Sequence, residues 1–258
     1  MKIQIMSDLH LDIWRSANLI PAVDRDLLIL AGDVMEMVEV PKYAEFFRKQ
    51  LEASPILWVM GNHEYYLSSI EKVKQEFGYL EQEFPGLTIL DDEVYFVRDD
   101  LMIIGSTYWT DMNNNSYGTK CTAMKYLNDF RVITYRGSAL HPEDTVKFNT
   151  DAVKFIDKTV RDSTFDGMQK IVVTHHSPSY KSVHTKYYLA GLANYCYVSD
   201  HDVFVDNLGK YGVTHWIHGH THHPQEYMIG DVQVLSNPIG YPEENYSGVN
   251  IPECFINV

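Results

Sequence analysis

Five short polar clusters in this 258-residue sequence contain side chains that bind metal ions. They combine carboxylate, imidazole and amide groups, a ligand set that suits Mn²⁺, Fe or Zn²⁺ better than Ca²⁺, which prefers oxygen alone. Seven candidate ligands are too many for one ion with an open position, and they suit two ions about 3.5–4 Å apart that share a carboxylate. The candidates are Asp8, His10, Asp33, Asn62, His175, His220 and His222.

Each cluster alone also has an ordinary structural interpretation. Asp8 could cap a helix, Asp33 could lie in a turn, and the adjacent His175 and His176 could be one packed and one solvated imidazole. The sequence HGHTHH at 218–223 is harder to explain in this way, because burying several imidazoles without partners is costly. The joint occurrence of five clusters favours metal binding.

The clusters follow short apolar runs that predict buried strands. These runs are rich in Ile, Val and Leu and cover residues 2–6, 27–31, 56–60, 171–174 and 213–217. Apolar residues at helical spacing predict helices over 41–53, 69–84, 142–160 and 200–210. Alternating strands and helices predict an α/β fold. Ligands of such folds bind beyond the carboxyl ends of the strands, where the five clusters lie.

Two patterns refine this prediction. The pairs 94–97 with 101–106 and 226–229 with 232–236 are typical of hairpins, so the sheets are expected to be mixed. Asp8/His10 and His220/His222 are spaced by two residues, which places both side chains on one side of an extended backbone. Each pair is therefore expected to direct two ligands to one place.

Two tyrosine-rich stretches, 107–137 and 177–199, show no regular pattern and follow predicted strands. Long irregular segments in a compact domain are often functional, so we expect cap-like loops that face the substrate. Trp109 and Tyr195 could stack there on a planar leaving group such as a nucleobase. Simple packing of these rings onto the body is an equal alternative. No repeat or linker divides the chain, so residues 1–258 are expected to form a single domain.

The complete set of motifs resembles the calcineurin-like metallophosphoesterase superfamily. The motifs are Asp8-x-His10, Gly32-Asp33, Gly61-Asn62-His63-Glu64, His175-His176 and Gly219-His220-x-His222. The resemblance implies a four-layered α/β/β/α sandwich with mixed sheets and a dinuclear metal site at the strand ends. It assigns one ion to Asp8, His10 and His222, the other to Asn62, His175 and His220, and the bridge to Asp33.

The resemblance also assigns a catalytic role and leaves one choice. His63 is implied to contact the phosphate or to protonate the leaving group. His175 lies nearer the strand end than His176, so His175 is expected to be the ligand and His176 to lie behind it or in the substrate pocket. The second motif often reads GDxxD, but Glu36 stands at its last position here, so a role that needs a second Asp is unsupported.

These observations predict a metal-dependent hydrolase of phosphate mono- or diesters. Two dications and the carboxylates of Asp8 and Asp33 sum formally to 4 − 2 = +2, which gives a phosphate a local reason to bind. A metal-bound water would attack phosphorus as hydroxide near neutral pH.

One alternative is a non-catalytic interaction module on the same fold, which would be expected to lack ligands. Another is a nuclease acting on single strands, which would use the basic residues Lys120, Lys125, Arg131, Arg136, Lys181 and Lys186.

The charge and composition of the chain limit the classes of substrate and binding partner that it could have. With 21 basic and 35 acidic residues, the net charge of −14 opposes an extended face for duplex nucleic acid or anionic lipid. The expected substrate is a phosphorylated small molecule or a nucleotide. Three cysteines without a CxxC motif, and no recognisable signal peptide or membrane span, predict a cytoplasmic protein without a membrane partner. The oligomeric state stays open.

Overall fold

Two mixed β-sheets form the centre of the computed structural model, which describes residues 1–244 and 254–258. The first sheet has the strand order β13-β1-β2-β3-β4, and the second has the order β11-β12-β10-β9-β6-β5. The strands of the first sheet are β1 Lys2–Met6, β2 Leu27–Ala31, β3 Ile56–Val59, β4 Leu87–Leu90 and β13 Phe255–Asn257. Those of the second are β5 Glu93–Arg98, β6 Leu101–Ser106, β9 Gln169–Thr174, β10 Val213–His218, β11 Gln225–Ile229 and β12 Val232–Ser236.

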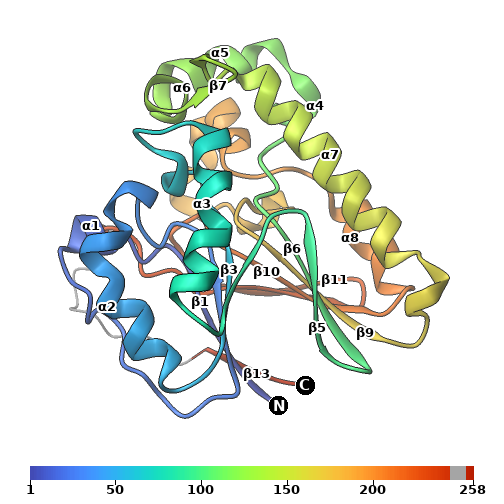
Figure 1. Ribbon diagram of the computed structural model, residues 1–258. Coiled ribbons are helices and arrows are strands. Elements are labelled where there is room, and N and C mark those ends of the chain that lie inside the picture. Colours follow the sequence, from blue (N-terminus) through green and yellow to red (C-terminus); the bar gives the residue numbers. More distant parts are fainter. Residues whose placement is uncertain (245–253) are drawn as a thin grey trace.

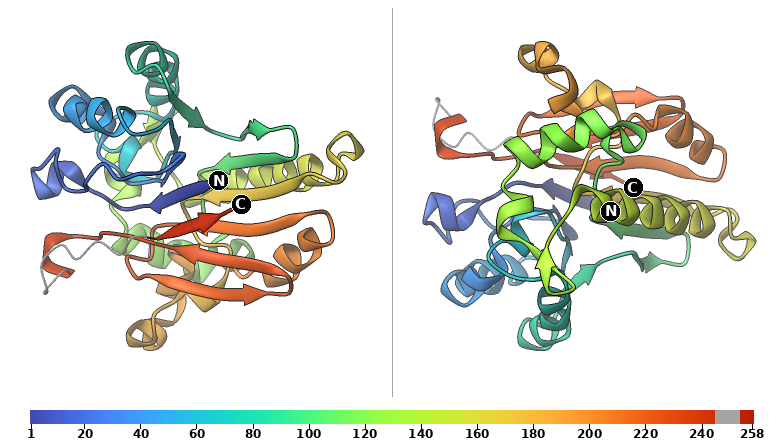
Figure 2. Two further views of the ribbon diagram at one scale, coloured as in Figure 1. Left: turned by 90° about the horizontal axis from the view of Figure 1, so that it is seen from below. Right: turned by 90° about the horizontal axis from the view of Figure 1, so that it is seen from above.

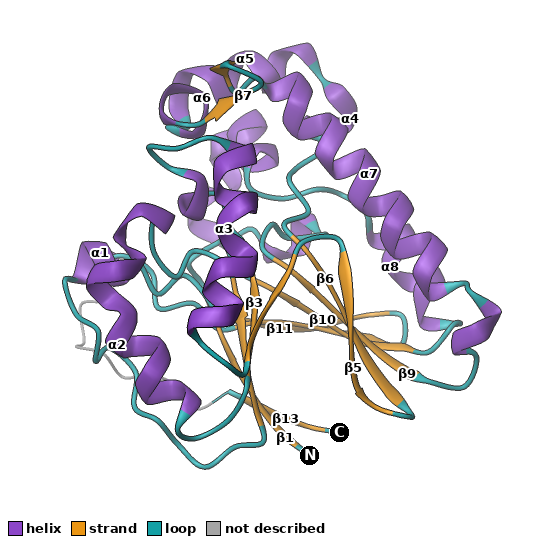
Figure 3. Cartoon of the chain, in the orientation of Figure 1, coloured by secondary structure: helices purple, strands orange, loops and turns teal. Residues whose placement is uncertain are grey.

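Helices cover the outer faces of both sheets (Figure 1). The first sheet carries α2 Val40–Leu51 and α3 Ile70–Glu83, and the second carries α7 Pro142–Val160 and α8 Asp202–Gly209. Figure 3 shows the strands between these two layers of helices. The remaining elements are α1 Leu11–Trp14, α4 Met112–Asn115, α5 Tyr117–Tyr126, α6 Asp129–Val132, β7 Thr134–Tyr135, β8 Ser138–Ala139 and the 3₁₀ turns η1 Met37–Glu39, η2 His63–Tyr65, η3 Ser163–Phe165, η4 Tyr180–Ser182, η5 Thr185–Cys196 and η6 Pro242–Glu244.

Side-chain alternation along the strands creates the four layers. In β2, Leu28 and Leu30 pack toward α2, whereas Leu27 and Ile29 face the second sheet. Successive residues of a strand point to opposite faces, so a strand that is apolar throughout serves two cores at once. In β9, Ile171 and Val173 belong to the central core and Val172 packs toward α7. The predicted four-layered sandwich with mixed sheets is confirmed.

The predicted helices agree with the structure to within a few residues, and local capping explains where they begin. The side chain of Ser69 accepts a hydrogen bond from the backbone N–H of Lys72 at the start of α3. Pro142 occupies the first turn of α7, where a missing N–H costs nothing. Ser69 thus pairs a backbone N–H that the helix itself leaves unpaired, and Pro142 removes one.

The segment 107–137 differs from the expected irregular loop, because it contains α4, α5, α6 and the short β7–β8 ribbon. Ser116 caps α5 by accepting from the N–H of Thr119. The sequence pattern did not predict α5, because the apolar residues of this helix do not lie on one face. The segment 177–199 consists mostly of 3₁₀ turns. The two segments are in contact, since the green α5 lies beside the gold η5 in the view from above (Figure 2, right). None of the helices in the described ranges is long and apolar enough to cross a bilayer.

Candidate active site

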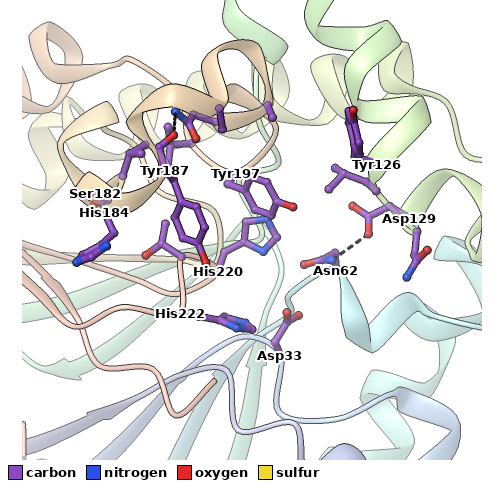
Figure 4. A pocket seen from close by; sticks show the side chains of 18 of the residues that line it. Asp33, Asn62, Tyr126, Asp129, Ser182, His184, Tyr187, Tyr197, His220 and His222 are labelled. Atoms are coloured by element: carbon purple, nitrogen blue, oxygen red, sulfur yellow. Dashed lines mark hydrogen bonds between the residues drawn. The ribbon is translucent and has the colours of Figure 1, made fainter. Parts of the chain in front are cut away.

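Two overlapping groups of acidic and imidazole side chains lie beyond the ends of β1, β2, β9 and β10. Within each group, the candidate ligand atoms lie within 4.8 Å of one another. The groups are Asp8, His10, Asp33 and His222, and Asp33, His175 and His220. The amide oxygen of Asn62 lies 3.1 Å from His175 Nε2 and so adjoins the second group. The structure therefore brings all seven sequence-predicted ligands together, with Asp33 in both groups, and four of them face one space in Figure 4.

The orientation of His175 is suited to binding a cation. Its Nδ1 lies 2.9 Å from the carbonyl oxygen of Ala31, which can only accept, so Nδ1 donates its proton there. In the neutral ring, the Nε2 lone pair then points at other electron-rich atoms: Asn62 Oδ1 at 3.1 Å, His220 Nδ1 at 3.1 Å and Asp33 Oδ2 at 3.3 Å. Such a convergence of lone pairs is repulsive unless a proton or a metal ion lies among them. A backbone carbonyl on the far nitrogen is also the usual way to fix a metal-binding histidine.

His222 has a corresponding arrangement in the first group. Its Nδ1 lies 2.7 Å from Glu244 Oε2, and its Nε2 faces Asp8 Oδ1 at 3.3 Å and His10 Nε2 at 3.1 Å. A carboxylate that accepts from the far nitrogen fixes the ring and makes it a stronger ligand. His10 Nδ1 and His220 Nε2 are buried and have no hydrogen-bond partner among the residues that the structure describes. The donor set and its orientation therefore fit a pair of N/O-bound metal ions.

The electrostatics of the cluster are dominated by its two buried carboxylates. Burial opposes protonation of His175, but Asp33 outweighs it and raises the pKa of His175 to about 9. Burial is likewise outweighed at His222, where Asp8 and Glu244 raise the pKa to about 10. Burial prevails at His10 and lowers its pKa to about 3. The carboxylates thus create a negative field that favours any cation in the cluster.

The backbone at five candidate ligands is left-handed. The φ angles are 51° at Asp8, 43° at His10, 54° at Asp33, 68° at His220 and 48° at His222. The expectation that paired ligands share one side of an extended backbone is therefore wrong, although the side chains do converge. Each strand ends in a sharp turn instead, and non-glycine residues at positive φ concentrate at functional sites.

Two glycines allow the strand ends to approach one another. A Cβ on Gly32, whose φ is +86°, would lie 2.2 Å from His175 Nδ1. A Cβ on Gly61 would lie 2.1 Å from Asp33 Oδ1. Real Cβ contacts are never this short, so any side chain at either position would displace a candidate ligand.

Glu64 joins the ends of β2 and β3 from inside the protein. Its Oε2 accepts from the N–H groups of Gly61 at 2.6 Å and Asp33 at 3.0 Å, and its Oε1 accepts from Val34 at 2.6 Å. Burial and the neighbouring Asp33 raise the pKa of Glu64 to about 8, while the three donors favour its charged form. The glutamate of the Gly-Asn-His-Glu motif therefore holds the two strand ends that carry Asp33 and Asn62.

His63 lies at the edge of the cluster, with its Nε2 4.0 Å from Asp33 Oδ2. Its ring stacks on Tyr66 with a centroid distance of 4.2 Å, and its Nε2 lies 3.0 Å from the hydroxyl of Tyr241. The backbone N–H of His63 donates to Asp33 Oδ1 at 2.9 Å. The ring is thus held between two tyrosines beside the candidate metal site, and it can exchange a proton with a group in the adjacent cavity.

The amide of Asn62 is oriented from the opposite side by Asp129. Asn62 Nδ2 donates to Asp129 Oδ1 at 3.0 Å, and the hydroxyl of Tyr66 donates to the same oxygen at 2.7 Å. Because the NH₂ group is committed to Asp129, the amide oxygen must face His175. Asp129 is fully buried, which raises its pKa, and α6 carries it into the site.

The predicted substrate residues lie away from the cavity beside the cluster. His176 is buried behind His220 with a ring centroid distance of 4.2 Å, and its Nδ1 lies 3.2 Å from the Thr107 carbonyl. Trp109 is buried and stacks on His176 at 5.2 Å. Tyr195 packs on Tyr180 at 5.0 Å. None of the three lines the cavity, which is lined instead by Tyr126, Tyr187 and Tyr197.

Four residues at the site escaped the sequence analysis: Tyr66, Asp129, Tyr241 and Glu244. A signal existed for the last two. Because β12 pairs in parallel with β10, its carboxyl end lies at the same edge of the sheet as the other clusters. Residues 237–244 follow directly and carry both side chains. Asp129 and Tyr66 belong to no motif and reach the site through tertiary packing.

Comparison with known proteins agrees with this site. The family model of the calcineurin-like phosphoesterases matches residues 1–224. An uncharacterised protein of Acanthamoeba polyphaga mimivirus is 26% identical in an alignment of 253 residues that covers 89% of this chain and 85% of that protein.

Solved structures share the fold at low sequence identity. Phosphopantetheinyl hydrolase from Mycobacterium tuberculosis is 17% identical, has a TM-score of 0.72 and covers 100% of this chain and 95% of its own. A putative 5′-nucleotidase from Staphylococcus aureus is 13% identical with a TM-score of 0.54, over 93% of this chain and 48% of its own. Since the family match spans most of the sequence, the chain belongs to the calcineurin-like phosphoesterases and is a phosphoric ester hydrolase.

Proposed function

We propose that the protein hydrolyses a phosphate monoester or diester of a small molecule with the help of two metal ions. The observation that carries this proposal is the position of Asp33, which belongs to both groups of candidate ligands. A carboxylate in that position can bind both ions of a dinuclear centre and offset their mutual repulsion. In the proposal, Asp8, His10 and His222 hold one ion, Asn62, His175 and His220 hold the other, and Asp33 bridges them. Mn²⁺, Fe and Zn²⁺ suit this mixture of nitrogen and oxygen ligands.

The chain's own residues contribute positioning and proton transfer. When bound, the ions would activate water and offset the charge of the phosphate. His63 lines the cavity next to Asp33 and is the proposed donor of a proton to the leaving oxygen. Tyr241 and Tyr66 keep the ring in place, one by a hydrogen bond and one by stacking. Glu64 and Asp129 hold Asp33 and Asn62 from behind.

The contacts of the basic residues favour a small substrate over a nucleic acid. Lys120 pairs with Glu143 at 2.9 Å, and Lys181 pairs with Asp202 at 2.9 Å. Arg131 donates to the carbonyl of Lys125. None of the six basic residues considered for a nuclease lines the cavity. A groove that follows a phosphate backbone needs free cations along its length. The non-catalytic alternative is disfavoured because all seven candidate ligands are present and converge.

The test combines metal analysis with a substrate screen. The purified protein would be analysed for bound metal and then assayed with Mn²⁺ on aryl phosphates, bis-aryl phosphates, nucleoside 5′-monophosphates, phosphopantetheine and a single-stranded oligonucleotide. We expect about two ions per chain, in line with a two-metal site, and hydrolysis of at least one small ester. Two bound ions without hydrolysis of any ester would support the interaction module, and preferred cleavage of the oligonucleotide would support the nuclease.

A further inference from the structure

A cavity of about 730 Å³ opens directly above the candidate metal site. Its floor is formed by the cluster residues Asp33, Asn62, His63, His220 and His222. One wall comes from the segment that contains α5 and α6, and the opposite wall comes from η5. The two walls are in contact with each other, and Gly118 of α5 lies against the side chain of Leu192 in η5. A phosphate on the floor would therefore project its ester group between these walls.

The cavity has few groups that could balance the charge of a second anion. Among the described residues that line it there is no Lys or Arg, and His184 is the one imidazole outside the floor, whereas Asp33, Asp129 and Glu244 are all acidic. The proposed ions would supply positive charge only at the floor. Any further phosphate, sulfonate or carboxylate higher in the cavity would meet these carboxylates with no permanent positive charge beside it, since only the imidazole of His184 could be protonated there. Lys186 is not part of the lining.

The walls are instead built from tyrosines and aliphatic side chains. Figure 4 shows Tyr187 and Tyr197 above His220, with Tyr126 on the other side of the cavity above Asp129. Leu127, Val183 and Leu192 also line the cavity. Tyr126, Tyr187 and Leu192 are exposed although they are large and apolar. A gathering of exposed apolar side chains beside a reactive centre is typical of a ligand-binding surface.

We propose that this cavity binds the leaving group of the substrate, and that the leaving group is uncharged and largely aromatic or apolar. The inference rests on the proposed phosphoesterase function and narrows its substrate class. The absence of Lys and Arg from the described lining disfavours polyphosphates and nucleic acids, and a bare alkyl phosphate would leave most of the cavity empty. Contacts with a ring or chain in the cavity would position the scissile bond over the metal site.

The first test compares two substrates that differ only in charge. 2-Naphthyl phosphate and its 6-sulfonate derivative present the same ring, but the second adds a negative charge within the cavity. We expect kcat/KM to be at least about tenfold lower for the sulfonate, since a charged group would be buried without a partner. Equal values for the two substrates would overturn the inference. Hydrolysis of neither these esters nor p-nitrophenyl phosphate would instead overturn the proposed function itself.

The second test uses neighbouring residues of η5 as matched pairs. Tyr187 lines the cavity and is 44% exposed, whereas Tyr188 does not line it and is 52% exposed. We expect Tyr187→Ala to raise KM for 2-naphthyl phosphate by about tenfold and Tyr188→Ala to leave it unchanged. Neither variant should alter metal content. Equal KM values for both variants and the wild type would contradict the proposed subsite.

The third test adds a positive charge to the cavity and asks whether the enzyme then accepts the charged ester more readily. Leu192 lines the cavity, and the fully exposed Leu189 lies outside it. We expect Leu192→Lys to reduce the preference for the neutral naphthyl ester over its sulfonate by about tenfold or more, because it supplies the missing counter-charge. Leu189→Lys controls for a general change in surface charge. If both lysine variants shift the preference equally, long-range attraction explains the result and the subsite is refuted.

Discussion

Replacing Asp129 tests whether the geometry of the candidate metal site depends on a residue that touches no metal. Asp129 Oδ1 accepts hydrogen bonds from Asn62 Nδ2 at 3.0 Å and from the Tyr66 hydroxyl at 2.7 Å, and the side chains of Asp129 and Asn62 are buried. In Asp129→Ala, the NH₂ group of Asn62 loses its charged acceptor and can rotate toward the metal. We expect the ions to be bound more weakly, with most of the loss in the ion that Asn62 holds.

The size of the effect follows from the hydrogen bonds that are removed. A hydrogen bond to a charged group is worth about 1.5–3 kcal/mol, and groups that orient metal ligands are worth roughly 10–100-fold in metal affinity. Asp129→Ala should therefore weaken binding of one ion by about 10–100-fold. Asp129→Asn retains an acceptor oxygen and should lose less. Tyr66→Phe leaves the bond between Asp129 and Asn62 intact and should lose least.

Metal affinity would be measured by competition with a chelator, together with the free energy of unfolding of the metal-free protein. The graded order of the three variants is the critical result. If Asp129→Ala lowered the stability of the metal-free protein while both ions bound with wild-type affinity, Asp129 would be a structural residue and the argument would fail.

Three further substitutions test other parts of the site. Asp33→Ala should reduce metal stoichiometry more than any other single ligand change, because its carboxylate is shared; two ions at wild-type affinity, measured by elemental analysis and titration, would exclude a bridge. His63→Asn should keep both ions but lower kcat by about 10²–10⁴-fold, with smaller losses for good leaving groups; wild-type kcat on a poor leaving group would remove His63 from the mechanism. Gly61→Ala should abolish binding of at least one ion, because its Cβ would lie 2.1 Å from Asp33 Oδ1. Gly78→Ala, in open space within α3, is its control and should bind metal normally, so equal metal contents would refute the steric argument.

The sequence predicted those parts of the molecule that depend on local pattern. Apolar runs that end in polar clusters located the strands and the seven candidate ligands, because a parallel strand in this fold delivers its next residues to the site. The helix α5 could not be predicted in this way, since its apolar side chains do not form one stripe. Asp129 could not be predicted either, because its importance comes from a contact with Asn62, which lies 67 residues away in the chain. The left-handed turns at the ligands also had no clear signal, because Asp and His are not the residues that favour this conformation most.

These left-handed turns bear on the evolution of the chain. Positive φ costs an ordinary residue about 1–2 kcal/mol relative to glycine, and Asp8, His10, Asp33, His220 and His222 all adopt it. Mutation under selection for folding alone would replace such residues with Gly or Asn, because either change relieves strain. A lineage that had abandoned catalysis would therefore lose these five side chains early, and gain thermal stability as it did so. Their joint presence in one sequence is expected if selection retains them as ligands of the proposed site, at a continuing cost to the stability of this edge of the sheets.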